Sequence, residues 1–348
     1  MNRKLERLLL LFLIVSLFGA CTDSEDNGVN VKSLYTSSLQ PAFYMAIEDS
    51  LQPAWLQEMI KSCPYLKVYH SKKDGGYYLV GHPDRTQITC KLYDAKGVLQ
   101  DITTQEALDG AIVADAPWTC IHIYSYPIVV GTAEWKALSI QERKERLQLP
   151  DNLLANMRTE DLIEVCLDYP YALDYSAYDD YQTGFIALYR QFNGLRELLN
   201  RDDLAEPFLL RLDINWKKAD FILEMKDTAP LKVGYYSSLS CMLFKLMLAQ
   251  DAVINQMSYS QLRRMLDICI RNTDIEIAYP EIWSSSAHES TLFIYAKVID
   301  NKGGFSFNDD KEKEMFNSFV KNPNRLLYTQ ILFYDDFCER IMKYVEDF

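Results

Sequence analysis

Adjacent acidic pairs are the residues of this chain whose type could support hydrolytic chemistry. They are Asp179-Asp180, Asp202-Asp203, Asp309-Asp310 and Asp335-Asp336. Hydrolysis of a glycosidic bond needs two carboxylates about 5–9 Å apart across a cleft, and neighbours on a helix point about 100° apart. Asp202 and Asp309 stand where helix N-caps and first turns favour acids. We therefore expect capping roles, and catalysis only if carboxylates of different helices converge.

The histidines and the loop around Gly303 give little indication of a metal site. His70 and His82 could face each other across a predicted hairpin, although four histidines in the chain fit ordinary surface positions better. A calcium loop at residues 300–304 would need an oxygen ligand where Lys302 stands. We predict no metal and no cofactor.

The sequence also lacks the common catalytic motifs. It contains no Gly-x-Ser-x-Gly elbow, His-Glu-x-x-His pair, Walker loop or dinucleotide fingerprint. No catalytic residue is therefore predicted.

Tyrosine is the most unusual residue, with 23 in the chain. Tyr171, Tyr175 and Tyr178 lie close together among several aspartates. A tyrosine ring offers flat apolar area with a polar tip, so the three could form a face for a glycan or a peptide. The alternative is helix packing, and it is favoured because Tyr181 shares an apolar stripe with Phe185.

The N-terminus has the pattern of an export signal. Three basic residues precede an apolar run over residues 8–18, which ends in Gly19-Ala20-Cys21. The run is too short to span a bilayer as a mature helix. It resembles a bacterial lipoprotein signal, although Phe18 stands where that family usually has Leu. The resemblance implies that Cys21 is lipidated and becomes the mature N-terminus. A plain secretory signal with a chance cysteine is the alternative.

Charge and cysteine content restrict the partners and the compartment. The net charge is −13, and near −15 without residues 1–20, which carry three bases and one acid. Nucleic acid is therefore not an expected partner. If Cys21 is lipidated, seven cysteines remain, so not all can pair. Cys63, Cys90 and Cys120 could include one disulfide outside the cytoplasm. The remaining four fall on apolar helix faces.

The part of the chain before residue 131 predicts a small α+β module. A short helix is expected over residues 53–60, with Pro53 at its first turn. Residues 66–70 and 77–80 alternate as a hairpin, and a second hairpin is suggested by residues 90–93 and 98–99. Further strand signal lies in residues 121–124 and 128–130. The segment resembles small modules of bacterial secreted lipoproteins over about residues 50–100.

From residue 131 onward the apolar period changes to about 3.6, which predicts helices. Ser139 is expected to cap a helix over residues 141–148, and Asp151 and Thr159 to open two short ones. The cleanest stripe predicts a helix over residues 178–193. No fixed-period repeat is visible, so an irregular bundle or a solenoid of helical hairpins is expected.

The order of motifs in this part is similar to a recurrent family of lipoprotein-anchored helical proteins. The matching motifs are Gly131-Thr-Ala-Glu-Trp135, Leu147-Gln-Leu-Pro150, Thr159-Glu-Asp-Leu162, Cys166-Leu-Asp-Tyr-Pro170, Gln182-Thr-Gly-Phe185 and Phe192-Asn-Gly-Leu195. The resemblance covers about 80 residues and implies no activity.

These observations predict an α+β protein in four parts. They are a lipoprotein signal peptide (1–20), a flexible tether (21–41), a small antiparallel α+β module (42–130) and a mainly α-helical domain (131–348). We expect a non-catalytic lipoprotein of the Gram-negative cell envelope, held at the outer membrane by its lipid, with a binding or structural role toward a glycan or protein ligand. The alternative is an envelope hydrolase that acts on glycan or peptide through paired carboxylates.

Overall fold

The computed structural model describes residues 43–44, 52–63, 65–71, 76–81, 89–100, 118–213, 231–278 and 285–348. Within these ranges the chain forms two compact units. The first contains the described residues up to Val129 together with Pro150–Asn156. The second contains Val130–Leu149 and Met157–Phe348. The predicted signal, tether and lipidated Cys21 lie outside the described residues.

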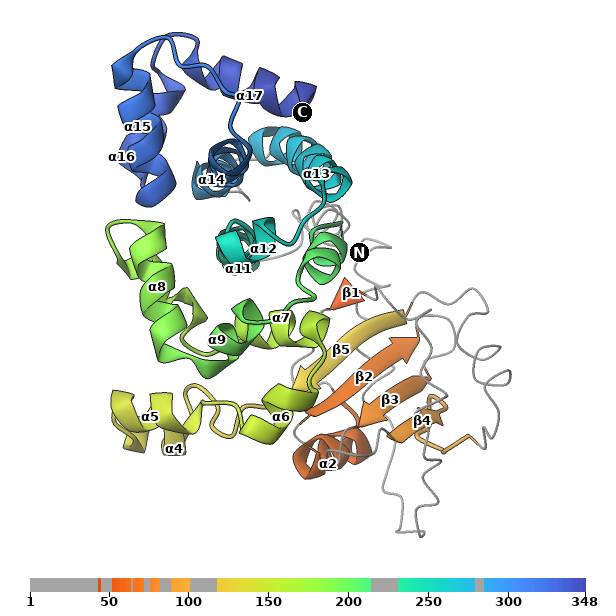
Figure 1. Ribbon diagram of the computed structural model, residues 1–348. Helices are drawn as coiled ribbons and strands as arrows, with labels where there is room; N and C mark the ends of the chain where they lie inside the picture. The colour runs from red at the N-terminus through yellow and green to blue at the C-terminus, as the bar shows by residue number, and fades with distance from the viewer. Residues whose placement is uncertain are drawn as a thin grey trace, which may run out of the picture. The chain divides into compact units, whose positions relative to one another are not determined.

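The first unit is built on a twisted sheet (Figure 1). Its strands are β1 Phe43–Tyr44, β2 Tyr65–Ser71, β3 Tyr77–Gly81, β4 Thr89–Tyr93 and β5 Trp118–Tyr124. They lie in the order β1-β5-β2-β3-β4. All neighbours are antiparallel except β1, which pairs parallel with β5. The hairpin predicted at residues 66–70 and 77–80 is confirmed as β2 and β3.

One short helix, α2 Ala54–Ser62, packs against this sheet (Figure 1). Pro53 precedes its first residue, and its fixed φ and missing N–H suit that place. Leu56 and Ile60 of α2 are buried with Leu66 and Val68 of β2. The helix predicted from the sequence is therefore confirmed, and its apolar face forms the core of the unit.

The turn after β4 follows from its residue types. The Asp94 carboxylate accepts hydrogen bonds from the backbone N–H groups of Lys96 and Val98, and Gly97 has φ +80°. The second hairpin turns back at Gly97 but pairs only at one bridge, between Tyr93 and Leu99, while the other edge of β4 pairs with β3. The strand predicted at residues 128–130 is wrong. That segment bends and turns, since β5 ends at Tyr124.

Gly97 is a position of this unit where a side chain would be costly. A Cβ there would lie 2.5 Å from Nε1 of Trp55, whose ring contacts Tyr77 and Tyr93. We expect Gly97→Ala to lower the free energy of unfolding by about 2–4 kcal/mol, as the sum of overpacking and a positive φ. Thermal unfolding followed by tryptophan fluorescence would measure it.

Gly131 supplies the matched control. It has φ +86°, and a Cβ there would meet nothing within 4 Å. Gly131→Ala should therefore show only the backbone cost, about 1 kcal/mol. Equal losses in the two variants would contradict a role for Trp55.

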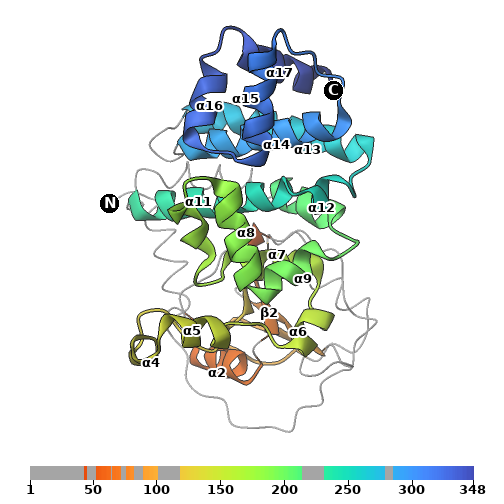
Figure 2. The same ribbon diagram turned by 60° about the vertical axis from the view of Figure 1, so that its left-hand side comes forward.

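The second unit is helical, as predicted, so the chain is an α+β protein with a mainly helical second part. Its elements, which Figure 2 shows from a second side, include α4 Ala133–Ala137, α5 Ile140–Arg146, α7 Thr159–Leu167, the 3-10 helix Ala172–Ala177, α8 Tyr181–Gln191, α9 Asn193–Leu199, a helix over 205–213, α11 Leu231–Leu248, α12 Asp251–Ile254, α13 Tyr259–Ala278, α14 Ser285–Lys302, α15 Asp310–Lys321, α16 Arg325–Leu332 and α17 Phe337–Asp347. The remaining helix, α6 Asp151–Asn156, belongs to the first unit.

The centre of the later helices is α14. It contacts α11, α12, α13, α15, α16 and α17. In a regular solenoid each repeat contacts only its neighbours, so these helices form an irregular bundle. Residues 289–296 of α14 are all buried, whereas a surface helix would bury only one side. Helices surround α14 on every side, which explains why its burial is not confined to a stripe.

Capping residues begin several helices where the sequence predicts. Ser139 forms a capping box with Glu142, and the Asp309 carboxylate accepts a hydrogen bond from the Glu312 N–H at the start of α15. The cap predicted at Asp202 is wrong, because the next helix begins at Ala205 and Asp202 lies three residues outside it.

The helix predicted over residues 178–193 is shorter in the structure. Asp180 caps α8, which ends at Gln191, and a 3-10 helix precedes it. The helical conformation is interrupted at Phe192, and Asn193 begins α9. The Asn193 amide both accepts from the Leu149 N–H and donates to the Leu149 carbonyl. It thereby fixes the chain before α6 to the start of α9.

The described helices include none that is both long enough and apolar enough to cross a bilayer. The Cys63 and Cys120 thiols donate to the backbone carbonyls of Tyr65 and His122, while Cys90 lies in β4 with its side chain outside the described residues, so the possible disulfide stays a prediction. Cys166 and Cys269 are buried as predicted, and burial raises the pKa of Cys269 to about 12. These thiols are therefore packing residues.

Candidate functional site

The three tyrosines of the predicted ligand face do not share one surface. Tyr175 is fully buried, and its hydroxyl donates to the Leu239 carbonyl at 3.0 Å. Tyr171 is half-buried, whereas Tyr178 is 45% exposed. Tyr175 cannot contact a ligand from the surface, so the packing interpretation holds for that residue.

Tyr171 belongs to a ladder of aromatic rings. Its ring stacks on Trp135 at 5.5 Å, and the Lys144 ammonium lies 5.4 Å from its centroid. The Arg143 guanidinium lies over the Trp135 ring, and its Nε donates to the Trp135 carbonyl. Sugars stack on an open ring face. Here each ring is engaged by another ring and by a cation, so the ladder serves packing.

The acidic pairs do not meet across a cleft in the described part of the chain. Asp180 and Asp309 cap helices, while Asp203 accepts a hydrogen bond from Thr159. Asp336 pairs with Arg340 one helical turn later. These carboxylates therefore have local structural partners.

Of the two histidines that could face each other across the hairpin, His82 lies outside the described residues. His70 is buried in β2, with its ring 4.8 Å from that of Tyr77. Residues 300–304 form the end of α14, where the Gly303 N–H bonds to the Ile299 carbonyl and Gly303 has φ +70°. This is a helix C-cap and no calcium loop. No group of three His, Cys, Asp or Glu suited to a metal occurs among the residues described.

A buried ionic cluster joins three central helices. Lys245 of α11 is 3% exposed by side chain and forms an ion pair with Glu276 of α13. Its ammonium also donates to Thr291 Oγ1 at 2.7 Å and to the Ala287 carbonyl at 3.2 Å, both in α14. An ammonium has three N–H donors, and all are used. Lys245 is therefore a structural clamp, with no donor left for a substrate.

The second oxygen of Glu276 lies 3.8 Å from Nδ1 of His288. Neither atom has a hydrogen-bond partner among the described residues. Burial lowers the pKa of His288, with the nearby Lys245 ammonium acting in the same direction and Glu276 against it. The ring is therefore neutral at pH 7. A neutral imidazole and a carboxylate at this separation can be bridged by one water molecule, or can form a direct hydrogen bond after a small rotation of either side chain. Neither arrangement requires a ligand.

Glu289, on the next position of α14, has a separate environment. It is 1% exposed, and the Tyr181 hydroxyl donates to its Oε2 at 2.5 Å. Burial raises the pKa of Glu289, while the Tyr181 hydrogen bond and Arg325 oppose that shift. This carboxylate fixes α8 to α14. Its partners are Tyr181 and Arg325, whereas those of Glu276 are Lys245 and His288, so the two carboxylates do not form a catalytic pair.

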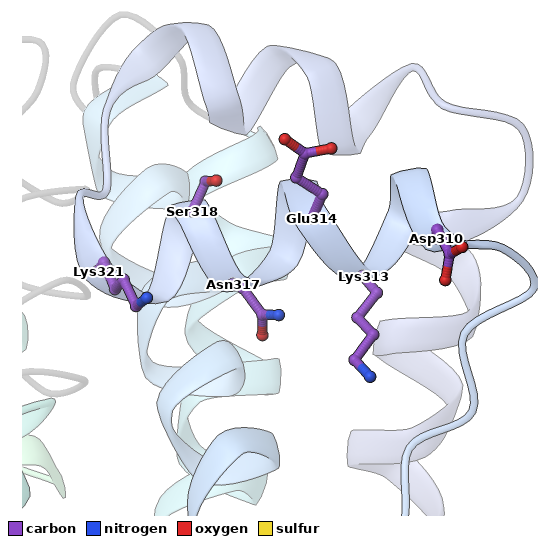
Figure 3. A pocket seen from close by; sticks show the side chains of 6 residues that line it. All are labelled: Asp310, Lys313, Glu314, Asn317, Ser318 and Lys321. Carbon is purple, nitrogen blue, oxygen red and sulfur yellow. The ribbon is translucent and has the colours of Figure 1, made fainter.

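A shallow hollow lies along the exposed face of α15. It is lined by Asp310, Lys313, Glu314, Asn317, Ser318 and Lys321. Figure 3 shows that all six come from this one helix and that their side chains point to different sides of it. Such a surface is open and brings no group from a second element toward a ligand.

The most unusual surface is the outer face of α16. Leu326 is 69% exposed, Phe333 is 77% exposed and Leu332 is 39% exposed. Ile331, on the opposite side, is fully buried. Large apolar side chains gathered on one exposed helix face mark an interaction site more often than single scattered ones do. Leu326, Gln330 and Phe333 share one side of the helix, and we call the surface that they form the α16 face.

Sequence reasoning missed both the clamp and the α16 face. A single lysine within the apolar run 242–248 was a usable signal for the clamp. The α16 face had none, because Leu326 and Phe333 look like core residues until the direction of the helix is known.

The fold and these sites define an α+β protein with a small sheet module and an irregular helical bundle. Comparison with family models, curated proteins and solved structures found no match to this chain. The resemblances proposed from its motifs therefore remain predictions.

Proposed function

We propose that this protein is a lipid-anchored, non-catalytic component of a bacterial cell envelope that binds a partner through the α16 face. The observation that carries the binding role is the exposure of Leu326 and Phe333 on a helix whose other side is core. Exposed apolar area of this kind is costly to keep in water unless a partner covers it.

The anchor is supported by the residues around Cys21. A short apolar run that ends in Gly-Ala-Cys suits processing at the cysteine. Each buried methylene contributes about 0.8 kcal/mol, and more than one acyl chain makes attachment stable. The acidic body would be repelled by anionic lipid, so the acyl chains would have to hold the protein at an outer-membrane surface.

The anchor is tested by the intact mass of protein from the membrane fraction, wild type beside Cys21→Ser. We expect a wild-type N-terminus at Cys21 with added acyl mass. The variant should lack that mass and leave the membrane fraction. An unlipidated wild-type chain that is cleaved at another residue would overturn the anchor.

The binding role is tested with a photo-reactive amino acid at Gln330, in the middle of the α16 face. Illumination of intact cells should produce a cross-linked product, and Phe333→Ser should reduce it. The same probe at Lys313, an exposed residue of α15, is the control and should give little product. Equal products from both positions would contradict a specific role for α16.

A further inference from the structure

The α16 face has a simple internal pattern. Leu326, Gln330 and Phe333 follow an i, i+4, i+7 spacing, which places them in one row along the helix. Thr329 lies beside that row and is exposed as well. The row is therefore apolar at its two ends and polar in the middle.

The two ends of the row carry opposite charges. Arg325 is exposed at the first residue of α16, and Asp335 is exposed just beyond its last residue. Neither forms a hydrogen bond or ion pair to another side chain within the part of the chain that the structure describes. A partner that covers the row would therefore meet a cation at one end and an anion at the other.

We propose that two copies of this chain dock through the α16 face, with the two helices antiparallel about a two-fold axis near Gln330. This inference rests on the binding role proposed above for that face, and it names the partner. Leu326 of one copy then covers the partner's Phe333, and the reverse contact forms on the other side of the axis. A two-fold contact uses the same patch twice, so the patch must complement itself.

The charges favour a second copy over other occupants. In the antiparallel arrangement Arg325 approaches the partner's Asp335, and this pairing occurs twice. The Gln330 amide has both donors and an acceptor, so the two copies of this residue can pair across the axis. An anionic lipid surface would be repelled by Asp335 and by the neighbouring Asp336, which disfavours insertion of this corner into a membrane.

The contact is small, so its affinity should be modest. One helix of eight residues lies well below the area of a stable dimer interface. Copies that are anchored to one membrane would meet at a high effective concentration, which makes a weak contact sufficient. We therefore expect self-association that is reversible in solution.

The test exchanges the two charges. Full-length chains with two different tags are purified in mild detergent, and their association is measured by sedimentation and by copurification. Arg325→Asp alone and Asp335→Arg alone should each weaken self-association about tenfold or more, because each creates two like-charge contacts. A mixture of the two variants should recover affinity to within about threefold of wild type, because the new charges are again complementary.

Two further variants keep the result interpretable. Phe333→Ser should also abolish association, and because its side chain is exposed, far-ultraviolet circular dichroism should be unchanged. Lys313→Asp makes the same change of charge on α15 and should leave association as in wild type. Failure of the mixture to recover while both single variants are weakened would overturn the antiparallel pairing.

The outcome can also separate this inference from the proposed function. A wild-type chain that stays monomeric up to about 100 μM overturns self-docking, since even weak specific contacts would be visible there. If the Gln330 probe then cross-links to a different envelope protein, the binding role stands with another partner. If it cross-links to nothing, both proposals fall.

Discussion

Replacement of Lys245 by methionine is expected to destabilise the helical bundle by about 3–5 kcal/mol, the usual cost of removing one partner from a buried ion pair. Methionine has a similar length but no charge, so Glu276 would keep a buried carboxylate without its cation. Thr291 and the Ala287 carbonyl would lose their donor as well. Urea unfolding followed by circular dichroism would measure the loss.

Two companion variants show whether the charge or the volume is responsible. Lys245→Met combined with Glu276→Leu removes both charges, and we expect it to regain most of the stability, because apolar replacements of a buried pair are often neutral. Arg264→Ala breaks the exposed pair with Glu206 and should cost less than about 1 kcal/mol. A double variant as unstable as Lys245→Met alone would contradict the ionic explanation.

Gly184→Ala is expected to destabilise the protein by about 3 kcal/mol or more, the upper end of what overpacking costs. The sign is unusual, because this change inside a helix normally stabilises by about 0.5–1 kcal/mol. Here the added Cβ would lie 2.1 Å from the Tyr175 carbonyl oxygen. Both atoms belong to or adjoin the backbone, so no side chain can rotate to relieve the clash.

The consequence is that α8 would have to move away from the 3-10 helix that carries Tyr175. The hydrogen bond from Tyr175 to Leu239 would be strained, and so would the bond from Tyr181 to Glu289. Thr183→Ala, at the exposed neighbouring position, is the control and should change stability by less than about 0.5 kcal/mol. Thermal unfolding of both variants would measure the two changes in stability. A Gly184→Ala variant that is more stable than wild type would contradict the close contact between this position and the Tyr175 carbonyl.

The sequence by itself was sufficient for the local structure. Pro53, Ser139 and Asp309 start their helices because they satisfy or avoid the free N–H groups there, a requirement that depends only on neighbours in the chain. The alternation of β2 and β3 and the 3.6 period after residue 131 likewise identified the sheet module and the helical part. The signal-like residues up to Cys21 are also read from sequence alone.

Tertiary structure decided what the side chains do. Tyr175 and Tyr178 are three residues apart and equally amphipathic, yet one is fully buried and the other is 45% exposed. The difference depends on α11, because the carbonyl of its Leu239, 64 residues away in the chain, accepts a hydrogen bond from the Tyr175 hydroxyl. Lys245 similarly finds its partners in α13 and α14, at separations that no local pattern encodes. Burial and charge pairing depend on which helices meet, so the partners of Lys245 and the exposure of the α16 face could be identified only in the folded chain, although a lysine within an apolar run already marked Lys245.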